Sequence, residues 1–258
     1  DSKGAEKGIS NLSKSLGGIG KVGSVALKGT AVAIGAATTA IGGLVVASTK
    51  AYASYEQLVG GVDTLFKDAS GQVQKYAADA YKTAQLSSNQ YMEQITGFSA
   101  SLIQSLDGDT KKAAEYGNRA IIDMSDNANK MGTSIGMIQN AYQGFAKQNY
   151  TMLDNLKLGY GGTKTEMERL IADANKVKKA NGEMGDLSIE SFSDIAEAIH
   201  TMQTELDITG TTAKEAGGTV SGSFGMMKSS VLNFLQQLGN PGADMKKFSQ
   251  EMIDSVKI

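Results

Sequence analysis

The feature that most constrains this chain is a long run without charge. Residues 29–49 contain no Asp, Glu, Lys or Arg, although charged residues make up 20% of the sequence. A helix over this run would be roughly 31 Å long, close to the roughly 30 Å apolar thickness of a bilayer. Its strong aliphatic side chains are few, namely Val32, Ile34, Ile41, Leu44, Val45 and Val46. The run is therefore long enough to span a membrane, but its insertion would be only marginally favourable.

Small residues recur at every fourth position of this run. On a helix they form one stripe along which another backbone can approach closely. The stripe consists of Ala31, Gly35, Thr39, Gly43 and Ala47. Ile34, Ile41 and Val45 fall on a different face, which would meet lipid, a partner chain or a protein wall.

Three interpretations of the run stay open. It is a segment that packs on protein in one setting and enters a membrane in another, a buried association helix that never meets lipid, or a constitutive anchor. A cleaved signal peptide is disfavoured, because the run begins far from the first residue and Lys50 follows it without a cleavage pattern.

The composition favours helices and excludes several kinds of chemistry. A single proline in 258 residues leaves long stretches free of the strongest helix breaker, whereas 31 glycines predict that the helices are segmented. The absence of cysteine excludes disulfides, thiolate catalysis and cysteine metal sites. The net charge is −2, and the basic residues are dispersed, so the sequence shows no basic patch that would bind a phosphate backbone. No sequence-specific nucleic-acid binding is therefore expected.

The predicted fold class is all-α, built from segmented amphipathic helices and helical hairpins, and elongated rather than compact. Five segments are expected. Residues 1–27 are a flexible Gly/Ser/Lys lead-in, 28–68 a long helix containing the uncharged run, 69–158 helical hairpins, 159–238 capped helices linked by glycines, and 239–258 the start of a further helix. No alternating run argues for a sheet. The chain begins at Asp1 and stops inside an apolar periodic segment, so we expect it to be part of a longer protein.

Start signals and apolar periods predict the individual helices. Ser87 and Gln90 form a capping box ahead of one helix that continues to Leu106, and Asp109 caps a second helix that continues to Met131. Thr133 begins a shorter helix that extends to residue 145. The glycines at 60 and 61 are expected to be the first hinge of the long N-terminal helix.

Further helices are predicted in the second half of the chain. Thr163 and Glu166 form a capping box ahead of a helix over residues 167–177. Ser188 opens the clearest period, over residues 189–206. A last pair of helices, over 224–238 and 245–256, is separated by Asn240, Pro241 and Gly242.

The sequence contains no convincing catalytic, metal or cofactor site. His200 is the only histidine, which excludes multi-histidine metal sites, and we interpret it as a surface or partly buried helix residue. The glycines of residues 159–162 precede Lys164 and Thr165 as in a phosphate loop. However, Thr163 rather than glycine precedes the lysine, and no strand leads into the loop, so the pattern fails.

Several stretches together resemble a known family. They are Asp1–Leu16, the apolar run leading into Lys50–Gln57, Asn155–Leu170, Ala198–His200 and Ile208–Ala216. These stretches are similar to phage tail tape measure proteins, of the kind found in long flexible tails of phages and prophages of Gram-positive bacteria. The match covers roughly residues 5–238, and Asn155–Leu170 is its most specific part. It brings no catalytic residue, and the sequence stops before any peptidoglycan-cleaving region.

The resemblance implies a structural protein held in several copies inside the tail tube, on which tube subunits assemble and whose length sets tail length. It implies other copies of the chain, tail-tube, tail-tip and tail-assembly chaperone proteins as partners. It places the protein in the tail lumen of the virion, in the host cytoplasm during assembly and, through residues 29–49, at the host inner membrane during DNA passage. If all 258 residues formed one extended helix, it would be at most roughly 390 Å long.

Other classes of function remain as alternatives. An all-helical chain with one Gly/Ala-rich apolar segment is also typical of an α-helical pore-forming toxin or a membrane-active secreted protein, which hides that segment against a bundle. A helical enzyme lacks any convergent site.

Overall fold

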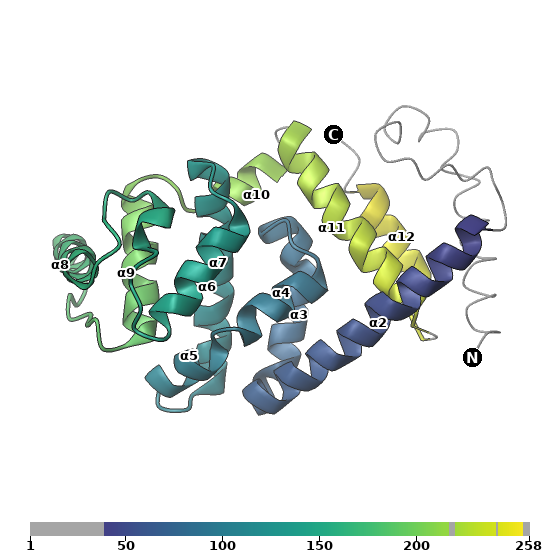
Figure 1. Cartoon of the computed structure of the whole chain (residues 1–258), viewed down its shortest axis with the longest axis horizontal. Coiled ribbons are helices and arrows are strands. Elements are labelled where there is room, and N and C mark those ends of the chain that lie inside the picture. Colours follow the sequence, from purple (N-terminus) through teal and green to yellow (C-terminus); the bar gives the residue numbers. More distant parts are fainter. Residues whose placement is uncertain (1–38, 217–219, 241, 255–258) are drawn as a thin grey trace. The chain divides into compact units, whose positions relative to one another are not determined.

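The computed structural model describes residues 39–216, 220–240 and 242–254, and every regular element within them is helical (Figure 1). The chain divides into a larger unit, residues 58–226, and a second unit made of residues up to 57 together with 227–257. Helices α2 (Thr39–Phe66) and α11 (Val220–Leu238) contribute to both units. The all-α prediction is thus confirmed for the described residues, and the elongated form stays a prediction.

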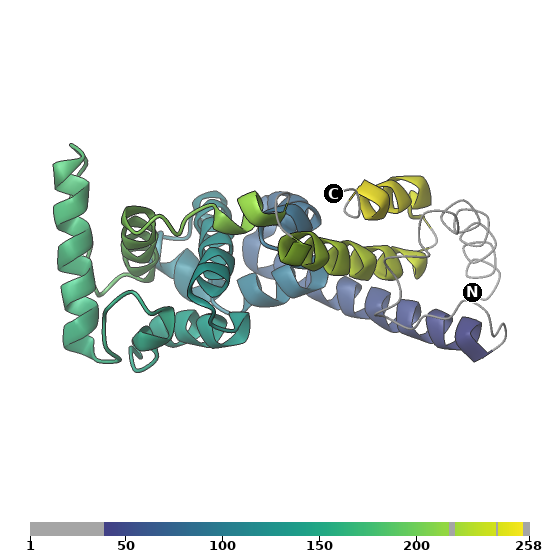
Figure 2. The same ribbon diagram turned by 90° about the horizontal axis from the view of Figure 1, so that it is seen from above.

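The larger unit is organised around its longest complete helix, α6 (Thr110–Met131). The other elements that lie wholly within this unit are η2 (Lys67–Ala69), α3 (Ser70–Thr83), α4 (Ser88–Thr96), α5 (Ser99–Ser105), α7 (Ile135–Phe145), η3 (Leu153–Leu156), α8 (Lys164–Ala180), α9 (Phe192–Glu205) and α10 (Thr211–Ala216). Helix α6 contacts α3, α4, α5, α7, α9 and α10. Helix α8 packs on α9 at the edge of this unit (Figure 2).

The core of the larger unit surrounds α6. Fully buried aromatic and aliphatic side chains come from most of the helices, among them Phe66, Tyr91, Met92, Ile95, Leu102, Ile121, Met124, Ile138, Tyr142 and Phe145. The close approach of α4 to α6 depends on Gly117, because a Cβ there would lie 3.0 Å from the Ile95 side chain. Burying each large apolar side chain stabilises the fold by roughly 1.5–3 kcal/mol, so this core accounts for the central position of α6.

The predicted start signals of α4 and α6 are confirmed. Ser87 accepts a hydrogen bond from the Gln90 N–H, and the Gln90 side chain accepts one from the Ser87 N–H, which is a complete capping box. Asp109 accepts from the N–H groups of Lys111 and Lys112 at the start of α6. These bonds satisfy backbone donors that have no partner inside a helix.

Two helix boundaries predicted from glycines and from periodicity are wrong. Gly60 and Gly61 form no hinge, because α2 continues through them to Phe66. The burial of Val62 and Phe66 in the following turns offsets the roughly 1 kcal/mol that each glycine costs a helix. The helix expected to continue to Leu106 instead breaks after Thr96, and the break places the Phe98 ring edge-on to Phe192, with 5.8 Å between ring centroids.

Three start signals differ in detail from the prediction. The helix assigned to Ser188 begins at Phe192, because the Ser191 hydroxyl accepts a hydrogen bond from the Asp194 N–H and so forms the N-cap. The Ser188 N–H donates to the Asp194 carboxylate. Ser134 rather than Thr133 caps α7. Thr163 caps α8 as expected, but Glu166 does not complete a box.

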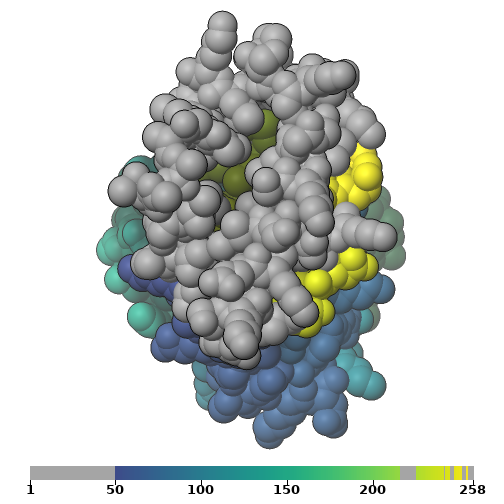
Figure 3. Space-filling view, turned by 90° about the vertical axis from the view of Figure 1, so that its right-hand side faces the viewer, coloured from purple at the N-terminus to yellow at the C-terminus, as the bar shows by residue number. Residues whose placement is uncertain are grey.

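The last two predicted helices are confirmed as α11 and α12 (Met245–Asp254). The buried side chains of α11 in the second unit are mostly polar, including Ser229, Ser230, Asn233 and Gln236 beside the buried Phe234. Lys247, Gln250 and Asp254 of α12 are exposed, and atoms of this helix are visible in yellow in Figure 3.

The turn before α8 requires glycine at position 162, where a Cβ would overlap the backbone carbonyl of Thr151. We predict that Gly162→Ala lowers the free energy of unfolding by about 2–3 kcal/mol, because neither backbone can move without breaking neighbouring turns. Gly136→Ala in α7, where nothing lies within 4 Å of the added Cβ, is the matched control and should stabilise by about 0.5–1 kcal/mol. Urea denaturation of both variants measures this difference, and equal stabilities would contradict it.

Candidate functional site

A network of paired charges joins α6, α8 and α9. Glu197 on α9 binds Arg119 of α6 through one carboxylate oxygen and Lys178 of α8 through the other, with 3.0 Å between Lys178 Nζ and Glu197 Oε1. Lys178 also binds Glu183 at 2.6 Å. Burial opposes ionisation of Glu197, but the charges of Arg119 and Lys178 outweigh it and lower the pKa of this carboxyl. The network, defined as these four residues, therefore holds a partly buried anion between two cations.

One turn further along both helices, His200 of α9 meets Asp123 of α6. The imidazole Nδ1 lies 2.9 and 3.0 Å from the two carboxylate oxygens of Asp123, which is 1% exposed. Burial raises the pKa of Asp123, and the hydrogen bond from His200 opposes that rise. No hydroxyl of the described residues is hydrogen-bonded to this imidazole, so the pair lacks the nucleophile of a catalytic triad.

A second buried acid on α6, Asp126, holds the start of α10. Asp126 is fully buried and accepts hydrogen bonds from the Gly210 N–H at 2.6 Å and the Thr212 N–H at 2.8 Å. Farther along α6, Asn129 donates to Glu215. The stretch Ile208–Ala216, one of those that carry the family resemblance, is thus fastened to the C-terminal half of α6.

The stretch Asn155–Leu170 is fastened to the same part of the molecule. Asn127 donates to the Leu156 carbonyl, Thr133 to the Asn155 carbonyl, and the Lys157 ammonium to the Met131 carbonyl. Asn127 lies near the end of α6, and Thr133 lies just beyond it. Lys157 belongs to the stretch itself and reaches back to α6. Both resemblance stretches therefore dock on the C-terminal end of α6.

The glycine loop before α8 is closed by its own side chains. The Arg169 guanidinium donates to the Gly159 carbonyl at 2.7 Å and lies 4.3 Å from the centroid of the Tyr160 ring. The Gly161 N–H donates to Glu166, which is why Glu166 does not complete a capping box. Burial and the neighbouring Asp173 raise the pKa of Tyr160 to about 12. An N–H that a phosphate would need is already occupied by a carboxylate, in keeping with the failed phosphate-loop pattern.

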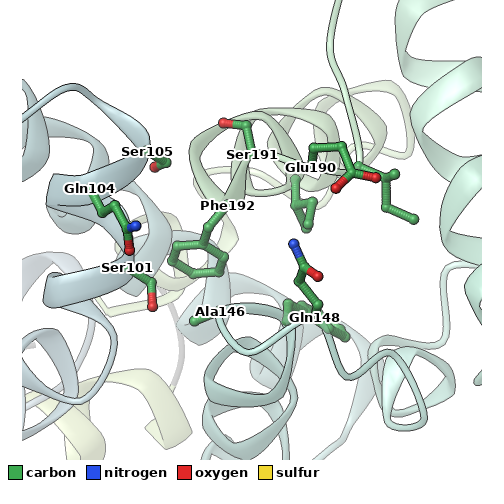
Figure 4. Close-up of a pocket in the computed structure, with 11 residues that line it drawn as sticks. Ser101, Gln104, Ser105, Ala146, Gln148, Glu190, Ser191 and Phe192 are labelled. Carbon is green, nitrogen blue, oxygen red and sulfur yellow. The ribbon is translucent and has the colours of Figure 1, made fainter.

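A polar hollow lies where α5, the end of α7 and the start of α9 meet (Figure 4). Its volume is about 290 Å³. Its lining includes the buried residues Phe145, Phe192 and Ile195. Around the rim, Ser101 and Gln104 lie on one side of Phe192, and Gln148 and Glu190 lie on the other (Figure 4).

The predicted membrane or association segment is only partly described. Ala31, Val32, Ile34 and Gly35 lie outside the described residues. Thr39, Gly43 and Ala47 occupy successive turns of α2, and the same helix contains Ile41, Leu44, Val45 and Val46. Within the part of the chain that the structure describes, none of the helices combines the length and the apolar character needed to cross a bilayer. The role of residues 29–49 stays a prediction.

The charge network and both buried acids of α6 were not predicted from the sequence. Arg119, Asp123 and Asp126 recur at intervals of four and three residues, which is the spacing of one helix face. That face also carries Ala120, Met124 and Asn127, all buried, so charged residues interleaved with an apolar stripe were the available signal. His200 is partly buried, as the sequence predicted, but its pairing with Asp123 was not foreseen. Among the described residues, no three His, Asp or Glu side chains converge as a metal site.

Comparison of the chain with protein-family models, curated protein sequences and solved structures finds no match in any of the three.

We predict that Glu197→Gln lowers the free energy of unfolding by about 2 kcal/mol near pH 7, which corresponds to about 4–8 °C in Tm. The pKa of Glu197 is lowered by folding, so its contribution is complete above the ordinary value of 4.5 and is lost as pH falls through the lower folded value. The gap in Tm between the native chain and the variant should therefore be constant near neutral pH and shrink as the pH falls below about 4.5.

The control for this variant is Glu168→Gln on α8, whose carboxylate is half exposed and 3.9 Å from Lys164. It should change stability by less than about 0.5 kcal/mol. A Tm gap for Glu197→Gln that is absent near neutral pH, or that widens in acid, would contradict the assigned role of the network.

Proposed function

We propose that this chain is part of a phage tail tape measure protein, a scaffold for tail-tube assembly that determines tail length. The observation that carries the proposal is the stretch Asn155–Leu170, supported by Ile208–Ala216, which resembles this family in sequence. Within the described residues, every regular element is a helix, as a scaffold that presents helical surfaces to tube subunits requires.

The site geometry supports an architectural use of its charged groups. Asp123, Asp126 and Glu197 are each engaged by groups from another helix or loop, and the closed glycine loop leaves no cradle for a phosphate. Carboxylates that are paired within the fold in this way fix the packing of helices and are not available to react with a substrate. We accordingly propose a structural role for these charged groups of the larger unit.

The proposed partners are other copies of the chain, tail-tube and tail-tip proteins, and a tail-assembly chaperone. The proposed location is the lumen of the tail in the virion, after assembly in the host cytoplasm. The small-residue stripe of residues 29–49 would pair copies inside the tube. After ejection, the same segment would enter the host inner membrane and assist DNA passage.

We predict that an in-frame deletion of residues 164–205, from the start of α8 to the end of α9, shortens the tail by about 60 Å if this region lies extended in the tube. Tail lengths in electron micrographs of phage that carries the deletion measure the effect. Replacement of the same residues by an unrelated helical sequence of equal length is the control and should restore the native length. An unchanged tail length in the deletion phage would refute a ruler role for this region.

We predict that Ile41→Asp together with Val45→Asp leaves tails assembled but impairs DNA delivery, since two charges near the centre of an inserted helix cost roughly 5–7 kcal/mol. Particle counts and plaque counts of the same stock separate assembly from infection. The control is Ala53→Asp with Ser54→Asp, two exposed positions of the same helix, which should infect normally. Normal infectivity of the Ile41 and Val45 variant would remove the membrane role and leave the ruler role untouched.

A second candidate function, an α-helical pore-forming protein, is favoured by the same uncharged run of residues 29–49. A pore-forming protein, unlike a tape measure protein, would act without being part of a virion. Release of dye from liposomes by the purified chain, combined with its absence from purified tails, would favour this candidate over the tape measure.

A further inference from the structure

We propose that Asn181, at the C-terminal end of α8, is a site of spontaneous deamidation, and that this modification loosens the end of the helix. Of the asparagines in the chain, Asn181 alone is followed by glycine. Asparagine is a thermolabile residue, and glycine leaves the next backbone nitrogen unshielded by a side chain. The modification depends only on local chemistry, so it goes beyond the tape measure proposal and is independent of it.

The reaction needs only water as a second reactant. The Gly182 N–H loses its proton, and its nitrogen forms a bond to Cγ of Asn181 while the Cγ–Nδ2 bond breaks and ammonia leaves. The product is a five-membered cyclic imide. Water then opens the ring at either carbonyl carbon, which yields aspartate or isoaspartate. No atom is oxidised or reduced, and the net change replaces a neutral carboxamide by a carboxylate.

The reacting groups are open to solvent. Asn181 and Gly182 are both exposed, and among the described residues the Asn181 carboxamide makes no hydrogen bond. Apart from the adjoining residues, no described atom lies within 4 Å of the position that a Cβ on Gly182 would occupy. Asn175, one and a half turns earlier, contrasts with this, because its carboxamide both donates to and accepts from the Leu187 backbone. Asn181 is therefore free to react, whereas Asn175 is held.

The backbone at this site is closed by the helix end. The Gly182 φ is +77°, its N–H donates to the Lys179 carbonyl at 3.1 Å, and the Glu183 N–H donates to the Lys178 carbonyl at 2.9 Å. These two bonds form a Schellman motif. The Gly182 nitrogen can reach Cγ of Asn181 only when the motif opens, and helix ends fray. The folded chain should therefore react more slowly than an unfolded peptide of the same sequence.

Deamidation places a new negative charge beside the charge network. A carboxylate at the C-terminal end of a helix is unfavourable, because the helix dipole is negative there. Isoaspartate has the larger effect, since it carries the main chain through the former side chain and so moves the N–H groups of Gly182 and Glu183 away from their carbonyls. Glu183 then loses its fixed position 2.6 Å from Lys178, whereas Lys178 keeps its bond to Glu197.

The experiment is incubation of the purified 258-residue chain in warm, mildly alkaline buffer made with H₂¹⁸O, followed by peptide mapping with mass spectrometry. We expect the peptide that contains Asn181 to gain about 3 Da and to contain both aspartate and isoaspartate. Asn140 of α7 is exposed but precedes Ala141, so it is the internal control and should stay unmodified. No mass gain at Asn181, an equal gain at Asn140, or aspartate as the sole product would overturn the proposal.

Variants test the cause and the consequence separately. Asn181→Gln should abolish the mass gain, because glutamine would have to form a larger ring. Asn181→Asp reproduces one product and should lower Tm by about 1–4 °C, whereas Asn140→Asp, an exposed position inside α7, should lower it by less than about 1 °C. An unchanged Tm in the Asn181→Asp variant would overturn the loosening of α8.

A synthetic peptide of residues 178–186 measures the protection that the fold provides. It should deamidate faster than the intact chain under the same conditions, because it lacks the hydrogen bonds of the helix end. Equal rates would contradict the closing of this site by the Schellman motif.

Discussion

The larger unit depends on two buried carboxylates that project from one helix, α6. Asp123 and Asp126 of α6 are 1% and 0% exposed, and burying an ionised carboxylate costs several kcal/mol unless groups with matched geometry surround it. Those groups come from distant parts of the chain: His200 for Asp123, and the backbone of Gly210 and Thr212 for Asp126. Apolar contacts alone would tolerate some sliding of α9 and α10 along α6. Hydrogen bonds with fixed direction permit only one register.

The same arrangement explains how the resemblance stretches fit into the fold. Asn155–Leu170 and Ile208–Ala216 are far apart in the sequence, but both are held by the C-terminal end of α6. Many of the polar residues in them make a bond that shapes a turn or anchors a loop. Part of their residue pattern is therefore explained by contacts that hold the larger unit together.

Local signals in the sequence predicted the starts of α4, α6 and α8, because a cap such as Asp109 or Ser87 acts within a few residues of itself. Signals that compete with tertiary packing failed. Gly60 and Gly61 stay helical because Val62 and Phe66 are buried beyond them, and the helix before Leu106 breaks because Phe98 packs on Phe192. The charge network and the hollow were out of reach for the same reason. Glu197 and Arg119 meet, and Gln104 and Gln148 come to line the same hollow, only after the chain has folded.

We propose that the chain is a helical scaffold enclosed by tail-tube subunits, and cross-linking mass spectrometry on intact purified tails tests this proposal most directly. Lys147, Lys164 and Lys179 are exposed on the larger unit and are available to an amine-reactive cross-linker. We expect cross-links from these lysines to tube subunits and to other copies of the chain. Tails that lack the chain, or cross-links from it only to proteins outside the tube, would contradict it.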